Sequence, residues 1–376
     1  MSTPSTALPR APEFGWGQWL AKAHIDLWLT LVLMTVCGLG LCVLYSASGH
    51  SSEMVTSQAQ RLVLGIVVML LCAQVPPELY RAVAPAFYGV AALLLVVVLV
   101  LGTESKGAKR WLALGFFRFQ PSELMKLAMP MTVAAFMHGR TLPPRWTTVL
   151  WTLLMIFVPG ALIIKQPDLG TALLVILAGI LALFFSGWSW RWIAGGGLVF
   201  GSGLPLVWHF LRDYQKKRVL TFLDPESDPL GAGYHITQSK IAIGSGGLFG
   251  KGWLNGTQAH LDFLPESHTD FIFSVYAEEF GLLGVFLLLA LYLALVGRGL
   301  IIALRGQDTF TRLLAGSLSL TFFFYGFINI GMVIGLLPVV GVPLPLVSYG
   351  GTSMVSLLAG FGVLMSIQTH RKLISS

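Results

Sequence analysis

Apolar stretches of roughly 20 residues, the length that a helix needs to cross a bilayer, follow one another along almost the whole chain. They are too long and too continuously apolar for the strands of a membrane barrel. Since only helices and closed barrels satisfy backbone polar groups in lipid, they predict transmembrane helices. We expect about ten spans, over residues 26–47, 61–76, 80–102, 121–138, 147–164, 169–186, 191–211, 271–296, 313–336 and 349–368.

Two polar connections are long, 103–120 and 212–270, and an even number of spans places both on one side, opposite the two termini. The connection 337–348 is apolar but contains prolines, so it predicts a re-entrant segment packed within the protein. We therefore expect an all-α polytopic membrane protein, a single domain over 1–376, with its large loop between helices 7 and 8 and residues 1–25 ahead of the first span. No internal repeat is visible, which argues against a transporter of inverted halves.

The composition supports a membrane protein, because only 11% of residues are charged and 55% are hydrophobic, whereas soluble chains carry about 25% charged residues. The net charge of +7 would suggest nucleic acid as partner of a soluble protein. In this chain the basic residues lie in short loops between apolar runs, so we expect anionic lipid and no nucleic acid. The cysteines Cys37, Cys42 and Cys72 lie inside apolar runs and predict no disulfide framework.

The distribution of Lys and Arg predicts the orientation. In the short connections they favour cytoplasmic termini, once the two long loops are set aside. The long loops then hold cations on the extracytoplasmic side, against the usual preference. A function that binds an anion on that side would explain them.

One candidate cluster lies where the fourth predicted span begins. Glu123 and Lys126 share a helix face at i, i+3. They form either a structural ion pair or, with the nearby Lys109, Arg110 and Arg118, a cationic pocket. Arginine suits phosphate because its guanidinium binds two oxygens at once.

A second cluster ends the large loop, where Asp262, Glu266, His268 and Asp270 precede an apolar span. Asp270 is either a helix N-cap or a general base, since a carboxylate at a lipid–water boundary can be made more basic by desolvation. Further along, one of Glu278 and Glu279 is expected to face the interior; Asp168 is a helix cap or points to a site.

Other patterns predict less chemistry. The glycine-rich stretch 244–252 lacks the features of a nucleotide loop and predicts a flexible loop. No metal-ligand spacing is present, so no cofactor is expected, and a divalent cation at a phosphate group is kept as an alternative. Small residues in the eighth and ninth spans, among them Gly316, Ser317 and Gly326, predict either a surface for a partner helix or internal packing.

Five ordered motifs resemble the shape, elongation, division and sporulation (SEDS) family: KGAKRWL (106–112), FQPSELMK (119–126), KQPDLGT (165–171), FLPESHTDFIF (263–273) and PLVSYGGTS (345–353). They extend across nearly the whole chain. Within the family, residues 106–111 and VVGVPLP (339–345) are more similar to the rod-elongation branch than to the division branch.

This resemblance implies a ten-helix protein of the bacterial inner membrane with cytoplasmic termini and a periplasmic active site. It implies a peptidoglycan glycosyltransferase that polymerises lipid II, the undecaprenyl-pyrophosphate-linked precursor, and whose partner is a class B penicillin-binding protein, a transpeptidase. The essential aspartate of the family falls on Asp270, the expected general base. The expected substrate- and pyrophosphate-binding residues are Lys109, Arg110, Arg118, Glu123, Lys126, Asp168 and Ser348.

Three other functions fit the same features. A lipid II flippase would use the same cationic pocket, although it needs a polar path across the whole bilayer. A scaffold that only positions a transpeptidase would leave the charges near the spans unexplained. A polymerase of the division branch would share the fold and the chemistry.

Overall fold

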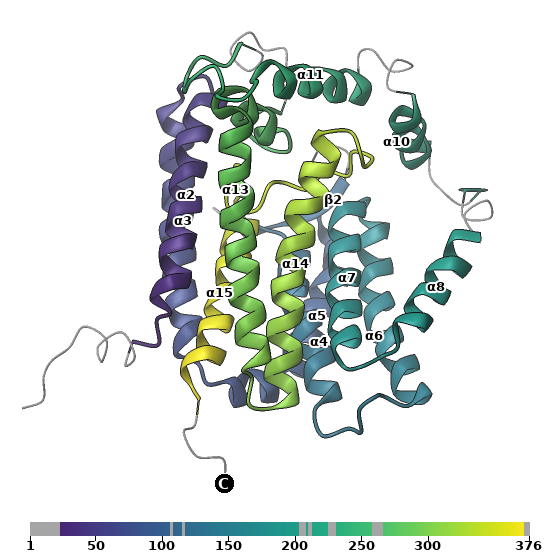
Figure 1. The fold of residues 1–376 in the computed structure, drawn as a ribbon. Helices are drawn as coiled ribbons and strands as arrows, with labels where there is room; N and C mark the ends of the chain where they lie inside the picture. The colour runs from purple at the N-terminus through teal and green to yellow at the C-terminus, as the bar shows by residue number, and fades with distance from the viewer. Residues whose placement is uncertain are drawn as a thin grey trace, which may run out of the picture.

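The chain folds into a bundle of long helices (Figure 1), in a computed structural model that describes residues 23–105, 108–114, 117–202, 208–209, 213–224, 231–257 and 266–371. This confirms the all-α polytopic prediction. The bundle helices are α2 (Leu27–Ala47), α3 (Ser52–Gln74), α4 (Pro77–Leu101), α5 (Pro121–Met137), α6 (Trp146–Lys165), α7 (Leu169–Phe185), α8 (Trp190–Ser202), α13 (Ile272–Leu304), α14 (Thr309–Val333) and α15 (Thr352–Thr369).

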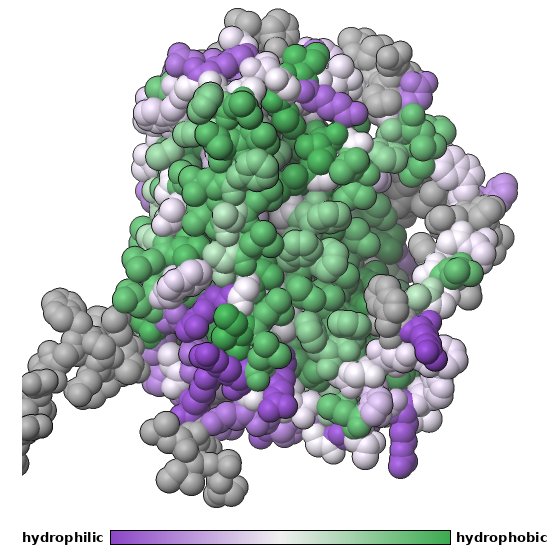
Figure 2. Space-filling view, viewed as in Figure 1, coloured by the Kyte–Doolittle hydropathy of each residue, from purple (hydrophilic) through white to green (hydrophobic). Residues whose placement is uncertain are grey.

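The outer surface identifies the bundle as a membrane-spanning one. Figure 2 shows a broad hydrophobic band between hydrophilic ends. Within the described residues, seven helices are long and apolar enough to cross a bilayer, and α5, α7 and α8 are shorter. Apolar side chains on the outside of the helices, such as Leu93, Leu150 and Phe286, are more than half exposed, as expected where lipid replaces water.

Several helix boundaries differ from the prediction. Helix α13 continues to Leu304, past the predicted end at residue 296, and α14 begins at Thr309 instead of residue 313. Helix α3 begins at Ser52, with the Ser51 hydroxyl as its N-cap, instead of near residue 61. Its first turns contain polar residues, so the apolar pattern did not include them. The predicted span 191–211 is helical over α8, but residues 203–207 and 210–211 lie outside the described part of the chain.

The connection after α4 contains a small sheet that the sequence analysis did not predict. Strands β1 (Thr103–Ser105), β2 (Ala108–Leu114) and β3 (Phe117–Phe119) pair antiparallel in the order β1-β2-β3. Trp111 is opposite Thr103, and Leu112 is opposite Phe119. The sheet holds the basic motif at the end of the bundle where α5 begins.

The described parts of the large loop contain α10 (Asp213–Leu223) and α11 (Ala232–Ser245). Helix α11 lies across the end of the bundle, over α13 and α14 (Figure 1). The buried Ser239 hydroxyl donates to the carbonyl of Val333 at 2.7 Å. This contact joins the loop to the end of α14.

The glycine-rich stretch forms a fixed contact with α13, so the prediction of a flexible loop is wrong for residues 246–252. Helix α13 is interrupted at Gly281, where φ is +63°. On either side of the break, the Lys251 amide donates to the Glu278 carbonyl at 3.0 Å and the Leu282 amide donates to the Gly247 carbonyl at 3.0 Å. A Cβ on Gly250 would lie 2.1 Å from the Glu279 carbonyl oxygen, so glycine permits the close approach of the two backbones.

The small residues of α14 pack internally. A Cβ on Gly316 would lie 2.9 Å from the Phe185 ring of α7, and one on Gly326 would lie 3.1 Å from the Tyr292 ring of α13. The Ser317 hydroxyl donates to the Ala178 carbonyl at 2.7 Å. Of the two alternatives, internal packing is therefore correct for these positions.

Candidate active site

Asp270 lies in the turn that precedes α13, and this turn is bound to the irregular segment before α15. The Ser348 hydroxyl donates to the carbonyl of Thr269 at 2.6 Å. The Tyr349 amide donates to the carbonyl of His268 at 2.9 Å. Asp270 itself is half-buried. The N-cap position of α13 is Phe271, without a side-chain capping bond, so Asp270 does not cap this helix.

A buried amide on α14 holds the main chain at Asp270. The Asn329 side chain is fully buried and donates to the Asp270 carbonyl at 2.8 Å and to the Val342 carbonyl at 2.7 Å. Val342 follows Gly341, whose φ is +75°. A Cβ on Gly341 would lie 3.5 Å from Oδ2 of Asp270, so the carboxylate lies against this glycine.

The segment 337–348 is irregular, residues 344–348 of it are buried, and side chains satisfy its backbone. The Tyr292 hydroxyl donates to the Pro345 carbonyl at 2.5 Å. Gln58 of α3 donates to the Ser348 carbonyl at 3.2 Å and accepts from the Gly350 amide at 3.3 Å. Polar partners of this kind are what an irregular backbone requires at membrane depth.

Glu123 and Lys126 form a buried ion pair on the central helix α5. The Lys126 ammonium donates to Oε1 of Glu123 at 2.8 Å and to the Tyr325 hydroxyl at 3.1 Å. The Ser356 hydroxyl of α15 donates to the other carboxylate oxygen of Glu123 at 2.6 Å. Both charged groups are thus paired, and the pair joins α5 to α14 and α15.

A cavity of about 750 Å³ opens beside this ion pair, between α3, α5, α15 and the small sheet. Its polar lining includes Arg61 and Glu123, and its aromatic lining includes Trp111, Phe119 and Tyr349. Leu64, Val68, Leu127 and Ala359 line its apolar part. Such a lining accommodates a ligand with an apolar tail and a charged head group.

Arg61 is a residue of the candidate site that the sequence analysis missed. Its guanidinium carbon lies 4.6 Å from the centroid of the Tyr349 ring. Tyr349 connects the two parts of the site, because its amide binds the turn of Asp270 and its ring lines the cavity. In the sequence, Arg61 is only the polar edge of an apolar run, and no motif marks it.

The basic strand is bound to the turn between α6 and α7. Arg110 donates from Nε to the Gln166 carbonyl at 3.3 Å and from Nη2 to the Pro167 carbonyl at 2.5 Å. Its Nη1 lies 4.0 Å from Asp168. The side chains of Lys109 and Arg118 lie outside the described part of the structure.

Asp168 acts as the N-cap of α7, the first of its two predicted roles. Its Oδ1 accepts from the Thr171 amide at 3.2 Å, and its Oδ2 accepts from the Gln120 side chain at 2.9 Å. Gln120 directly precedes α5. Asp168 therefore joins the starts of α5 and α7.

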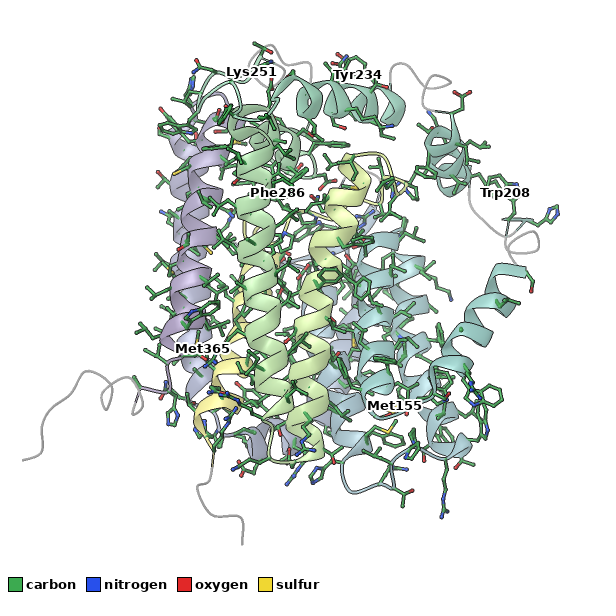
Figure 3. All side chains as sticks on the ribbon, viewed as in Figure 1. Met155, Trp208, Tyr234, Lys251, Phe286 and Met365 are labelled. Carbon is green, nitrogen blue, oxygen red and sulfur yellow. The ribbon has the colours of Figure 1, made fainter. Side chains whose placement is uncertain are left out.

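Glu278 and Glu279 are both buried, where only one was expected to face the interior. Glu278 accepts from the Lys251 ammonium at 2.6 Å and from the Thr257 amide at 2.9 Å. Figure 3 shows Lys251 at the end of the bundle where α11 lies, far from Met365. Glu279 accepts from the Ser46 hydroxyl of α2.

The remaining members of the second cluster are placed differently. Asp262 lies outside the described residues. Glu266 is exposed and accepts from the Thr269 hydroxyl at 2.9 Å. His268 lies beside Tyr349, with ring centroids 6.1 Å apart. Within the described ranges, no three His, Cys, Asp or Glu side chains are grouped as metal ligands.

Comparison with solved structures supports this arrangement. A chain from a peptidoglycan synthase complex, described as coordinating polymerization and crosslinking, superposes with a TM-score of 0.81 at 32% identity, covering 92% of this chain and 99% of that one. The rod shape determining protein RodA of Thermus thermophilus superposes with a TM-score of 0.72 at 31% identity, covering 94% and 100%.

Sequence comparison gives the same family. The peptidoglycan glycosyltransferase MrdB of Escherichia coli K12 is 54% identical over 355 residues, 94% of this chain and 96% of that protein. The probable peptidoglycan glycosyltransferase FtsW of Trichlorobacter lovleyi is 36% identical over 365 residues, 93% and 95% of the two chains. The family pattern described as cell cycle protein, which covers FtsW, RodA and SpoVE, matches residues 25–373. This chain therefore belongs to the FtsW/RodA/SpoVE family of cell cycle proteins.

Proposed function

We propose that this chain polymerises lipid II into glycan strands on the outer face of the membrane, with Asp270 as the general base. The chain is a peptidoglycan glycosyltransferase of the elongation type, as its identity to MrdB over 94% of its length supports. The substrate and the role of Asp270 are our inference. The observation that carries it is the connection, through Tyr349, between the turn of Asp270 and the cavity that contains Arg61.

The proposed reaction is a direct displacement. The 4-hydroxyl of the acceptor sugar gives its proton to the Asp270 carboxylate, and its oxygen attacks the anomeric carbon of the donor. The bond from that carbon to undecaprenyl pyrophosphate breaks, and the pyrophosphate leaves with the electron pair. A single displacement inverts the anomeric centre, and no covalent intermediate with the protein is needed.

The departing pyrophosphate requires cations close to its oxygens. Among the described residues, Arg61 is the basic side chain that lines the cavity. Lys126 is engaged by Glu123 and Tyr325, and Arg110 is engaged by two carbonyls. We therefore assign Arg61 to the pyrophosphate, and assign Lys126 and Arg110 to shaping the cavity and its rim.

The same proposal gives the orientation of the chain in the membrane, the place of the lipid tail and the partner protein. The long loops and the Asp270 turn face the periplasm, the termini are cytoplasmic, and the membrane is the bacterial inner membrane. The apolar lining at Leu64, Val68 and Leu127 takes the first part of the undecaprenyl chain. The partner is a class B penicillin-binding protein, which crosslinks the strands; a related complex that coordinates polymerization and crosslinking supports this choice.

The decisive experiment uses the full-length chain, purified in detergent with its transpeptidase, and labelled lipid II. Micelles present no second membrane face, so a flippase would give no product. We expect a ladder of glycan polymers from the wild type and none from Asp270→Asn. Asp308→Asn is the matched control, because Asp308 caps α14 at the opposite end and Asn also caps helices. Absence of polymer from the wild type would overturn the proposal.

A further inference from the structure

Helix α14 contacts both halves of the proposed site from one face. Tyr325 and Asn329 are four residues apart, so their side chains lie on the same side of the helix, separated by about 6 Å along its axis. The Tyr325 hydroxyl accepts from Lys126 at 3.1 Å. Asn329 donates to the Asp270 carbonyl at 2.8 Å. One rigid helix thus spans the ion pair beside the cavity and the turn of Asp270.

We propose that Asn329 is a positioning residue. It fixes the Asp270 carboxylate by holding two main-chain segments together, at the carbonyls of Asp270 and Val342. This inference rests on the proposed role of Asp270 as the base. Asn329 is fully buried, so it does not itself contact a substrate. Its effect on the reaction passes through the backbone of Asp270.

The hydrogen-bond geometry explains why this position requires an amide. The two protons of the Asn329 amino group go to two carbonyls from different segments, those of Asp270 and Val342. No hydroxyl or carboxylate can donate twice in this way. The two segments are thereby kept at a fixed separation, and the Asp270 carboxylate lies against Gly341, which belongs to the second of them.

The neighbouring contacts hold other residues of the turn, and Asn329 holds Asp270 itself. The N-cap of helix α13 is Phe271, which makes no side-chain capping bond. Ser348 and Tyr349 hold the preceding residues, Thr269 and His268. Asn329 is the side chain that an observed hydrogen bond joins to the main chain of Asp270. Loss of that bond removes a direct restraint on the residue whose placement determines proton transfer.

A general base must lie within hydrogen-bond reach of the proton that it removes. A displacement of about 1 Å can lower a rate by about 10²-fold. Because Asn329 acts on the base and not on the cavity, its removal should lower kcat and leave KM for lipid II nearly unchanged. A side chain that only stabilises the fold would instead lower the amount of folded protein without changing kcat per folded molecule.

The test measures kcat and KM for lipid II with the full-length chain and its transpeptidase, for Asn329→Ala, Asn329→Gln and Ser317→Ala. Ser317 is the matched control, because it is a buried polar residue of the same helix and donates one bond to a backbone carbonyl. We expect Asn329→Ala to lose about 10²-fold in kcat at nearly unchanged KM. Asn329→Gln, which keeps both donors on a longer side chain, should fall between Ala and the wild type. Ser317→Ala should lower the unfolding temperature and keep kcat.

Two results would overturn the inference: wild-type kcat in a folded Asn329 variant, or an equal loss of kcat in Ser317→Ala. If Asn329→Ala does not fold, Asn329→Gln decides by the same criterion. Asp270→Asn in the same assay separates this inference from the proposed function. If Asp270→Asn is as active as the wild type, the assignment of the base is wrong. If Asp270→Asn is inactive while the Asn329 variants are fully active, only the positioning role is wrong.

Discussion

Two carboxylates near the start of α13 are held in opposite ways. Asp270 is anchored through its main chain, whose carbonyl accepts from Asn329 at 2.8 Å, and its side chain is half-buried. Glu278 is anchored through its carboxylate, which accepts from the Lys251 ammonium at 2.6 Å and the Thr257 amide at 2.9 Å, and it is fully buried. The two residues belong to one segment of the chain.

The difference indicates what each carboxylate does. The contacts of Glu278 join the 246–257 part of the large loop to α13, so we interpret it as a structural group. The bond from Asn329 holds Asp270 at its main-chain carbonyl and not at its carboxylate. Proximity in sequence to the turn of Asp270 is therefore a poor guide to function, and the way in which the carboxylate is held is a better one.

After Asp270 itself, the largest effect on the rate is expected at Arg61. Arg61→Ala should lower kcat by about 10²–10³-fold, as loss of a group that stabilises developing negative charge does. The fold should be little affected, since the observed contact of Arg61 is a cation–π contact with Tyr349, worth about 0.5–1 kcal/mol at partly exposed sites. Polymerisation kinetics and a thermal unfolding curve measure both. A wild-type kcat would remove Arg61 from the site.

Glu278→Gln should show the opposite behaviour. Breaking a buried ion pair costs about 3–5 kcal/mol, and we expect the lower end because Lys251 is 28% exposed. The unfolding temperature should fall, while kcat per folded molecule stays close to that of the wild type. A stable Glu278→Gln protein without activity would contradict the comparison, because Glu278 would then take part in the reaction.

The smallest effect is expected at Arg110. Arg110→Lys keeps the charge but cannot bind two carbonyls through one planar group, so it should cost about 1 kcal/mol of stability, the net value of one hydrogen bond. The loss of activity in Arg110→Lys should be smaller than the loss in Arg61→Ala. A large loss of activity at unchanged stability would instead assign Arg110 to the pyrophosphate, as the sequence alone suggested.

The sequence predicted the apolar architecture well, because lipid requires continuous apolar helices. Helices α2, α5 and α7 begin and end within a residue or two of the predicted spans. The start of α3 was missed because its buried side includes the polar residue Gln58. The Gln58 side chain forms hydrogen bonds with the distant backbone of Ser348 and Gly350. The three strands were missed because they are only 3, 7 and 3 residues long, too short to show a clear alternating pattern.

The site was predicted only in part. Motifs identified the turn of Asp270 and the ion pair of Glu123 and Lys126, which local spacing reveals. Arg61 and Asn329 were missed because their roles depend on contacts with segments distant in the chain. The glycines of 246–252 were misinterpreted because glycine is equally compatible with a flexible loop and with a close approach of two backbones.

The most direct test of the account is the rate of lipid II polymerisation by Asp270→Asn, compared with the wild type at equal amounts of folded protein. Asn keeps the size of the side chain, and the main-chain bond to Asn329 does not involve that side chain. The account predicts a rate about 10²–10⁴-fold below the wild type, the usual cost of losing a general base. A folded Asp270→Asn protein that polymerises lipid II at the wild-type rate would contradict it.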